Sequence, residues 1–309
     1  MASRLLAPFW NAAERRPRAL WRVLVQSVLV LALGFAAGQF LSPAVATLAT
    51  GPAAPVVSGV IPLAVVLASV AAAGYALDDR PLRDFGLRVS RGWWMDLGFG
   101  LALGAALQSG VFAVEYALGW VRVTGTLVGS PATGLPALLV LFVCVGVYEE
   151  VLSRGYQLTN AAEGLRAIGE VPAVTVATLL TASLFGALHY TNPAASVRSS
   201  ALVAVGGVFL GLGYVLTGEL AVPIGFHVTW NFFQGAVWGF PVSGLAVGTS
   251  VVAVDQRGPA LFTGGRFGPE AGLVGLAALA VGTAVLVAYV AWRRGDVGVH
   301  PNVVTPERL

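Results

Sequence analysis

The chain has 309 residues, of which 57% are hydrophobic and only 11% are charged, and its mean hydropathy is +0.80. Length alone suggests two soluble domains, but a composition this apolar excludes them and indicates a membrane protein with several spans. The formal net charge is +3, and every basic residue is an arginine near the end of an apolar segment. This pattern does not predict nucleic-acid binding. The single cysteine, Cys144, excludes an intramolecular disulfide.

Eight segments of the chain are long and apolar enough to cross a membrane, which takes about 20 residues per helix. The first follows several arginines but is longer than the apolar part of a signal peptide, so we expect a retained transmembrane helix. The sequence therefore predicts an all-α polytopic membrane helix bundle of about eight transmembrane helices. In chain order, the predicted spans are 23–48, 56–77, 97–119, 136–159, 172–190, 199–217, 222–240 and 271–292.

The arginines predict the orientation of these spans. With the N-terminus in the cytoplasm, Arg80, Arg83, Arg88 and Arg91 fall in one inside loop, and excess arginine on the inside is the usual bias. We therefore expect a multi-pass protein of the cell membrane with both termini in the cytoplasm. Residues 1–309 then form a single membrane domain, with a cytoplasmic N-terminal segment 1–22, a motif-bearing core 136–240 and a cytoplasmic tail 295–309.

Three segments between or beyond the spans have a distinct character. Residues 78–98 alternate in charge and contain Trp93 and Trp94, which is typical either of an interfacial stretch or of a solvated loop ending in an aromatic belt. Residues 241–270 are rich in glycine and valine, and we expect them to pack over the mouth of the bundle. The tail 295–309 is polar, and we expect it to be mobile.

Three charged residues, Glu149, Glu150 and Arg154, interrupt the apolar run of the fourth predicted span. A charge in hydrocarbon costs roughly 2.5 kcal/mol or more, so partners inside the protein must satisfy these groups. Residues four apart share a helix face, which lets Glu150 and Arg154 form an ion pair, whereas Glu149 is turned away by about 100°. The pair can simply lock the helix. Glu149 is left for another role, such as a general base acting on water.

Histidines occur at two places in the later spans. His189 lies near the end of the fifth span, and His227 begins a helical turn that ends at Asn231. Either histidine alone is more typical of packing or of an interhelical hydrogen bond. His227 and Asn231 are four residues apart, so they offer an imidazole and an amide to the same point. We assign no role to His300, which lies in the tail.

Together these groups supply a carboxylate base, two imidazoles and an amide donor for a developing oxyanion. This set suits hydrolysis of a peptide bond by activated water. It is also close to the two-histidine, one-carboxylate set of catalytic zinc, so a zinc enzyme remains an alternative. The chain contains no His-Glu-x-x-His, no Gly-x-Ser-x-Gly and no intramembrane Gly-x-Gly-Asp motif.

The segments EEVLSR (149–154), FGALH (185–189) and HVTWN (227–231) resemble, in this order, the three motifs of the CPBP family. This family of CAAX proteases and bacteriocin-processing enzymes is also called Abi. Each motif alone is weak, but three in order on predicted spans form a strong signal, and the similarity extends over 136–240. The stretch 84–87 is also similar to the family.

The resemblance implies an intramembrane endopeptidase whose partners are the lipid bilayer and a membrane-associated protein or peptide substrate, of CAAX type or of bacteriocin or immunity type. It implies that Glu149 and His189 activate water, while His227 and Asn231 stabilise the oxyanion. Glu150 and Arg154 match the supporting pair. We favour a mechanism without a cofactor or metal; the alternative is zinc held by Glu149, His189 and His227.

Two other classes of protein remain as alternatives. A proton-coupled transporter can use buried carboxylates and histidines as a relay, but it favours an inverted repeat, which the sequence does not show. A catalytically silent membrane scaffold is the second alternative, because a fold does not guarantee activity. The complete set of motifs argues against the scaffold.

The predicted span boundaries leave one conflict, because they place His189 about 17 residues, roughly 25 Å, into the fifth span. At that depth it cannot share a water with Glu149 and His227. We therefore expect that the fifth span begins later than Pro172, or that a helix is tilted or broken. We also predict that Glu149, His189 and His227 surround one cavity.

Overall fold

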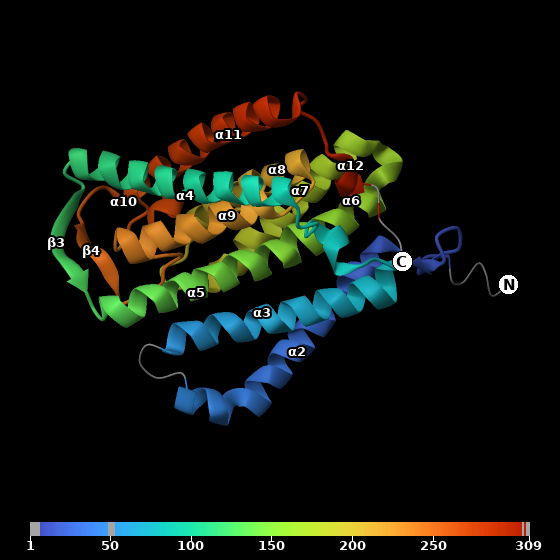
Figure 1. Cartoon of the computed structure of the whole chain (residues 1–309), viewed down its shortest axis with the longest axis horizontal. Helices are drawn as coiled ribbons and strands as arrows, with labels where there is room; N and C mark the ends of the chain where they lie inside the picture. The colour runs from blue at the N-terminus through green and yellow to red at the C-terminus, as the bar shows by residue number, and fades with distance from the viewer. Residues whose placement is uncertain (1–6, 49–52, 305, 307–309) are drawn as a thin grey trace.

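The protein is a bundle of long helices that run along one common direction (Figure 1). The structure, a computed structural model, describes residues 7–48, 53–304 and 306, with the backbone alone described for 42–48. Among the described residues, seven helices are long and apolar enough to cross a membrane. The predicted all-α polytopic bundle is confirmed, and the chain is a multi-pass membrane protein.

In the described part of the chain, the bundle is built from eight longer helices and several short helical segments. The longer helices are α2 (Ala19–Leu48), α3 (Ala54–Ala73), α4 (Arg91–Ala117), α5 (Pro131–Glu150), α7 (Glu170–Leu188), α8 (Val197–Thr217), α9 (Ala221–Asn231) and α11 (Leu273–Arg294). The short α-helices are α6 (Thr159–Leu165), α10 (Ala260–Thr263) and α12 (Pro301–Val304). Three π-helical segments are η2 (Gly74–Asp78), η4 (Val151–Leu158) and η7 (Phe232–Val237), and four 3₁₀ turns are η3 (Leu82–Phe85), η5 (Arg166–Ile168), η6 (His189–Thr191) and η8 (Pro269–Ala271).

Two of the predicted spans differ from the structure. The fourth does not end at residue 159, because α5 continues without a break through η4, α6 and η5 as one rod, Pro131–Ile168. The seventh predicted span, 222–240, is helical over only the 11 residues of α9 and the 6 of η7, and it does not qualify as a span by length. Instead α9 packs between α4, α5 and α8, where most of its side chains are buried.

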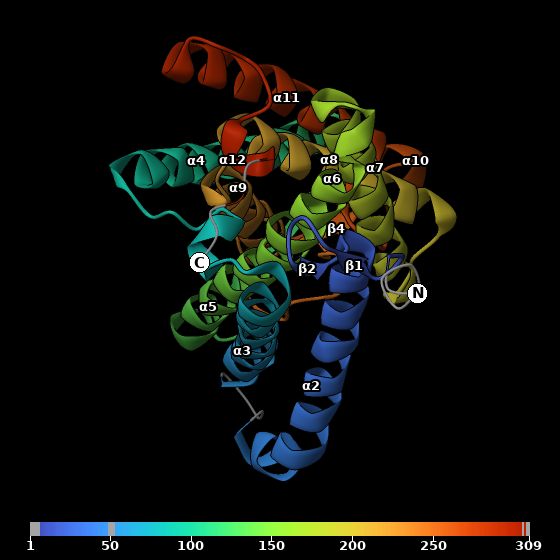
Figure 2. The same ribbon diagram turned by 90° about the vertical axis from the view of Figure 1, so that its right-hand side faces the viewer.

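Helix α2 lies at the edge of the molecule, and Figure 2 shows it beside α3 on one side of the bundle. It packs against α3 and α6 and exposes large apolar side chains such as Leu31 and Phe35. An exposed apolar face is the expected surface of a helix that faces lipid. The segment predicted as the first span therefore forms the rim of the bundle.

Two small sheets were missed by the prediction of an all-α fold. Strands β1 (Trp10–Asn11) and β2 (Arg16–Pro17) pair as a hairpin before α2. At the opposite end of the bundle, β3 (Val121–Val128) pairs antiparallel with β4 (Ser250–Gln256) (Figure 1). Both longer strands are rich in β-branched residues, which is the local signal that favours strands. The pairing itself joins segments about 130 residues apart, which no local pattern predicts.

The stretch 78–98, predicted as interfacial or as a solvated loop, differs from the solvated loop in its first part, where the side chains of Asp78, Arg80 and Asp84 are buried. Arg22 forms ion pairs with Asp78 at 2.8 Å and with Glu163 at 3.0 Å, and Arg80 pairs with Asp84 at 2.6 Å. All five side chains are almost fully buried. Buried charges require such partners, so these arginines stabilise the fold. After the short 3₁₀ turn η3, the stretch continues from Arg91 as the beginning of α4.

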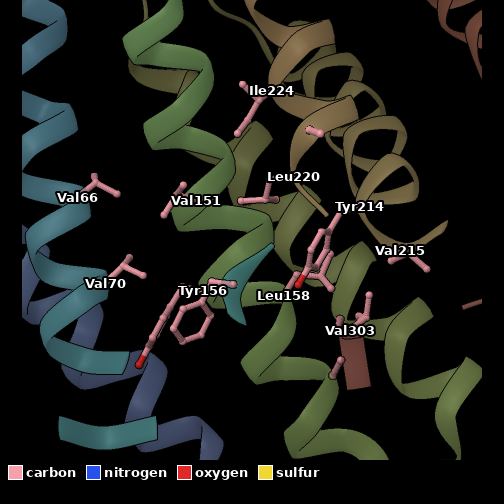
Figure 3. Packing of buried hydrophobic residues seen from close by; sticks show 14 of the residues in the cluster. Val66, Val70, Val151, Tyr156, Leu158, Tyr214, Val215, Leu220, Ile224 and Val303 are labelled. Atoms are coloured by element: carbon pink, nitrogen blue, oxygen red, sulfur yellow. The ribbon is translucent and has the colours of Figure 1, made fainter. Parts of the chain in front are cut away.

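The tail also differs from its prediction, because residues 300–304 are docked. The His300 backbone N–H donates to Val215 O at 2.9 Å, and the Val303 side chain in α12 is fully buried. Val303 belongs to a large apolar cluster in which η4 contributes Tyr156 and Leu158 (Figure 3). Burial of Val303 explains why a polar tail is ordered here. Residues 305 and 307–309 lie outside the described part of the tail.

Helices α4 and α9 approach each other closely through glycines. A Cβ atom added at Gly104 of α4 meets the Phe226 carbonyl oxygen of α9 at 2.5 Å, and one added at Gly225 of α9 meets the Leu101 nitrogen of α4 at 2.8 Å. Small residues of this kind let the backbones of membrane helices come into contact. The glycines therefore determine where α9, with His227 and Asn231, sits in the bundle.

We predict that Gly104→Val destabilises the protein by about 1–3 kcal/mol, because the added side chain must push two backbones apart. Gly110→Val is the matched control, since a Cβ at Gly110 of the same helix meets nothing within 4 Å. The measurement is thermal unfolding of both purified variants in the same detergent. Equal unfolding temperatures for the two variants would contradict the role of the glycine contact.

Candidate active site

The four residues predicted to do chemistry line a single cavity of about 830 Å³. Glu149 comes from the last turn of α5, His189 follows directly after α7, and His227 and Asn231 lie on α9. Helices α5, α7, α8 and α9 form most of the wall, and residues 242–247 of the loop before β4 complete it. The predicted packing of the segment 241–270 over the bundle mouth is thus confirmed for these residues.

The conflict over the depth of His189 disappears because the fourth helix is longer than predicted. Glu149 precedes Ile168, the end of that helix, by 19 residues, and His189 follows Glu170, the start of α7, by 19. The two helices pack side by side in opposite directions, so the two residues come level. The fifth span begins before Pro172, not after it, so the expectation of a later start was wrong.

The predicted ion pair between Glu150 and Arg154 is present, with 2.9 Å between Oε1 and Nη1. Arg154 also donates to the Gly207 carbonyl of α8 at 3.0 Å, and its guanidinium lies 4.6 Å from the centre of the Phe185 ring. Both charged side chains are buried, so the interaction links η4 to α7 and α8 in the interior of the bundle. The helix turns from α to π immediately after Glu150, a local change that is frequent at functional sites.

Glu150 has a second partner that the sequence reasoning missed. Its Oε1 lies 2.8 Å from Nδ1 of His227, on a helix 77 residues further along the chain. An ionised carboxylate can only accept, so Nδ1 carries the hydrogen. Nε2 of the ring is then directed away from Glu150, and a carboxylate that orients a histidine in this way is a common device in active sites.

The remaining carboxylate, Glu149, is held more loosely. Its Oε2 lies 3.8 Å from Nε2 of His227, which is too long for a hydrogen bond, and this oxygen has no hydrogen-bond partner among the described residues. A buried acceptor without a partner is unusual, and at an active site it is able to accept from a ligand or a reacting water.

His189 is oriented by its own helix. Its Nδ1 lies 2.8 Å from the Phe185 carbonyl oxygen, which can only accept, so Nδ1 carries the hydrogen and Nε2 is unprotonated in the neutral ring. The Phe185 ring centre lies 4.6 Å from that of His189 and 6.3 Å from that of His227. Phe185 therefore positions both imidazoles, a role that its place in the motif does not reveal.

The amide of Asn231 completes the polar lining. It follows His227 by one helical turn and has no hydrogen bond to another side chain or backbone group in the described part of the chain. An amide that lines a cavity without a protein partner can donate to a ligand oxygen. His227 and Asn231 both line this cavity from α9.

The histidines and carboxylates do not converge as a metal site would require. Within the described residues, no three histidine, cysteine, aspartate or glutamate side chains are grouped so that they could hold a metal ion. Nδ1 of His227 and Nδ1 of His189 both serve hydrogen bonds within the protein, which leaves Nε2 of each ring for a ligand. In their present positions, Glu149, His189 and His227 do not form such a metal-binding group.

A further carboxylate, Glu270 of η8, also lines the cavity and belongs to none of the motifs. It accepts from the Gln234 side chain of η7 and from the Ser243 backbone N–H. Burial raises the pKa of Glu270 to about 7. Its position in a loop rich in glycine left no pattern by which the sequence could indicate it.

Comparison with known families agrees with the resemblance seen in the motifs. Residues 131–233 match the family described as type II CAAX prenyl endopeptidase Rce1-like, a part of the CPBP family. The matched segment begins with α5 and ends in η7, so it contains all three motifs. No curated protein and no solved structure matches the chain.

We predict that Arg154→Met lowers the free energy of unfolding by about 3–5 kcal/mol, because it leaves the buried Glu150 carboxylate without its cation. The double variant Glu150→Gln/Arg154→Met should recover part of this loss, since no buried charge remains unpaired. The measurement is a double-mutant cycle by denaturation in mixed micelles. Additive losses in the double variant would show that the ion pair does not couple the two residues.

Proposed function

Because residues 131–233 match the Rce1-like family of type II CAAX prenyl endopeptidases, we propose that the protein is an intramembrane endopeptidase. In this proposal it hydrolyses a peptide bond of a membrane-associated protein or peptide, and CAAX-type processing is the favoured form. The observation that carries the proposal is the meeting of Glu149, His189, His227 and Asn231 around one cavity. The end of the bundle that holds β1, β2 and α12 then faces the cytoplasm.

The nucleophile in this mechanism is a water molecule bound between Glu149 and His189. The partnerless Oε2 of Glu149 and the unprotonated Nε2 of His189 are the two acceptors able to take its hydrogens. As the water oxygen attacks the scissile carbonyl carbon, its proton passes to this pair. The same proton is then available to the leaving amine when the tetrahedral intermediate collapses.

His227 and Asn231 act on the other side of the reacting carbonyl. The Asn231 amide donates to the developing oxyanion, and Nε2 of His227 donates as well when the ring carries both protons. Glu150 is the counter-ion of that ring at 2.8 Å, and Arg154 in turn balances Glu150 at 2.9 Å. The chain of contacts holds the donor in place before the reaction, so no reorganisation is needed during it.

The remaining wall of the cavity is mostly apolar, with side chains such as Phe142, Leu188, Leu202 and Leu210. An apolar wall limits the number of waters near the reacting groups and strengthens each electrostatic contact made there. It also suits a substrate that carries apolar groups and arrives from the bilayer. These features support hydrolysis inside the bundle by a single bound water.

We predict that Glu149→Gln lowers kcat for cleavage by about 10²–10⁴-fold with little change in KM, because the amide cannot take a proton from water. The measurement is cleavage of a prenylated CAAX peptide by the purified protein in proteoliposomes. Glu170→Gln is the matched control, since Glu170 is an exposed carboxylate at the start of α7. Unchanged cleavage by Glu149→Gln would defeat the assignment, and proton-coupled flux without cleavage would favour a transporter.

We further predict that cleavage does not depend on a metal, because the described side chains do not gather as a zinc site. Incubation with excess 1,10-phenanthroline, followed by removal of the chelator, should leave kcat/KM unchanged. Metal content of the purified protein is measured in parallel. Loss of activity that added zinc restores would contradict this part of the proposal.

A further inference from the structure

Glu270 is the one carboxylate that faces the cavity from outside the three motifs. It lies in the short turn η8 directly before α11 and is half-buried, with its side chain directed into the cavity wall beside Ser243. The proposed mechanism gives it no task. Its contacts therefore need a separate explanation.

The carboxylate is held rigidly by neutral donors. Gln234 donates to Oε2, and the Ser243 N–H donates to Oε1. Gln234 is itself fixed, because Gln108 of α4 donates to it at 2.7 Å and it also donates to the Pro241 carbonyl at 2.6 Å. A Cβ added at Gly268, where φ is +124°, meets Oε2 of Glu270 at 2.5 Å, so only glycine lets the backbone pass so close.

No cation balances this charge in the described part of the protein. None of the ion pairs there includes Glu270, and no arginine lines the cavity. The other titratable groups of the wall are Glu149, His189, His227 and Tyr148. The side chains that bind Glu270, from η7 and from the loop before β4, are uncharged. Of the helices packed on η8, α10 has no charged residue, α8 has Arg198, which donates to the Ala260 carbonyl, and α11 has Arg293 and Arg294, which contact Met95 and Asp96. A half-buried carboxylate without a counter-ion is costly, and a bound cation relieves that cost.

Glu270 lies close to the proposed reaction centre. Its partner Gln234 follows Asn231 by three residues on the continuous helix of α9 and η7, which corresponds to roughly 5 Å along the axis. A peptide whose scissile carbonyl meets Asn231 therefore passes within side-chain reach of Glu270. The substrate residue that comes within reach of Glu270 is therefore one of the few nearest to the scissile bond.

We propose that Glu270 is a specificity-determining residue that binds a lysine or arginine side chain of the peptide substrate near the scissile bond. This inference rests on the proposed endopeptidase function and extends it to the chemistry of the substrate. The same charge distribution repels a substrate carboxylate, since Glu149 and Glu270 both face the cavity.

The titration of Glu270 makes the substrate preference depend on pH. Burial raises its pKa from 4.5 to about 7, so the side chain is largely neutral below that pH and ionised above it. Preference for a cationic side chain therefore grows as the pH rises through about 7. The effect is separate from the general base, because it concerns the ratio of two substrates cleaved by the same residues.

The test compares prenylated peptides that differ only by lysine, norleucine or glutamate at each position within three residues of the cleaved bond other than the prenylated cysteine. With the full chain in proteoliposomes at about pH 8, kcat/KM for lysine should exceed that for norleucine about tenfold at one position, with glutamate lowest. Glu270→Gln should reduce this ratio to about twofold or less while norleucine cleavage stays near wild type. Glu270→Lys should make glutamate the preferred residue.

Asp255→Asn is the matched control, because it removes one exposed carboxylate of strand β4, outside this cavity. This variant should leave kcat/KM for all three peptides unchanged. A wild-type ratio near one at every position, or an equal loss of all three substrates in Glu270→Gln, would overturn the proposal and leave the endopeptidase function standing. Failure of the wild type to cleave any peptide would overturn both.

A measurement on the wild type alone covers the case in which the Glu270 variants do not fold. The ratio of kcat/KM for lysine to that for norleucine should rise severalfold between about pH 6 and about pH 8, following ionisation of Glu270. The lysine side chain of the peptide remains charged over this whole range, so a change in the ratio reports ionisation of the protein and not of the substrate. A ratio that is flat with pH would overturn the proposal.

Discussion

Placing the Glu150 carboxylate in the interior of a membrane bundle costs several kcal/mol unless other groups neutralise it. The protein meets this requirement from two sides, with Arg154 at 2.9 Å and His227 at 2.8 Å from the same oxygen. Arg154 in turn reaches the Gly207 carbonyl of α8. One buried charge therefore connects the rod of α5 and η4 to both α8 and α9, and these elements form the walls of the candidate active site.

The same principle operates at the end of the bundle near α12, where Arg22 bridges Asp78 and Glu163. In both places a charge that hydrocarbon does not tolerate is used to join helices distant in sequence. Between these ionic contacts, the glycines of α4 and α9 bring two backbones together without any polar group. The position of His227 and Asn231 thus depends on one electrostatic contact and one steric fit.

Motif reasoning identified the cavity residues because their chemistry is conspicuous in an apolar chain. The pairing of Glu150 with Arg154 was predicted because it is local, between residues four apart on one helix. The contact of Glu150 with His227 was missed because it joins two helices across 77 residues. The depth of His189 was misjudged because polar residues after Thr159 suggested the end of a span, whereas the helix continues to Ile168.

By itself, the sequence determined the membrane class, most of the spans and the residues that meet at the site, since hydropathy and helical spacing are local properties. Tertiary structure alone decided that α9 is a short inner helix, that β3 pairs with β4, and that Glu270 faces the same cavity as Glu149. Each of these depends on contacts between distant segments. The free energy of such contacts comes from packing and charge pairing in the folded bundle, which no single stretch of sequence contains.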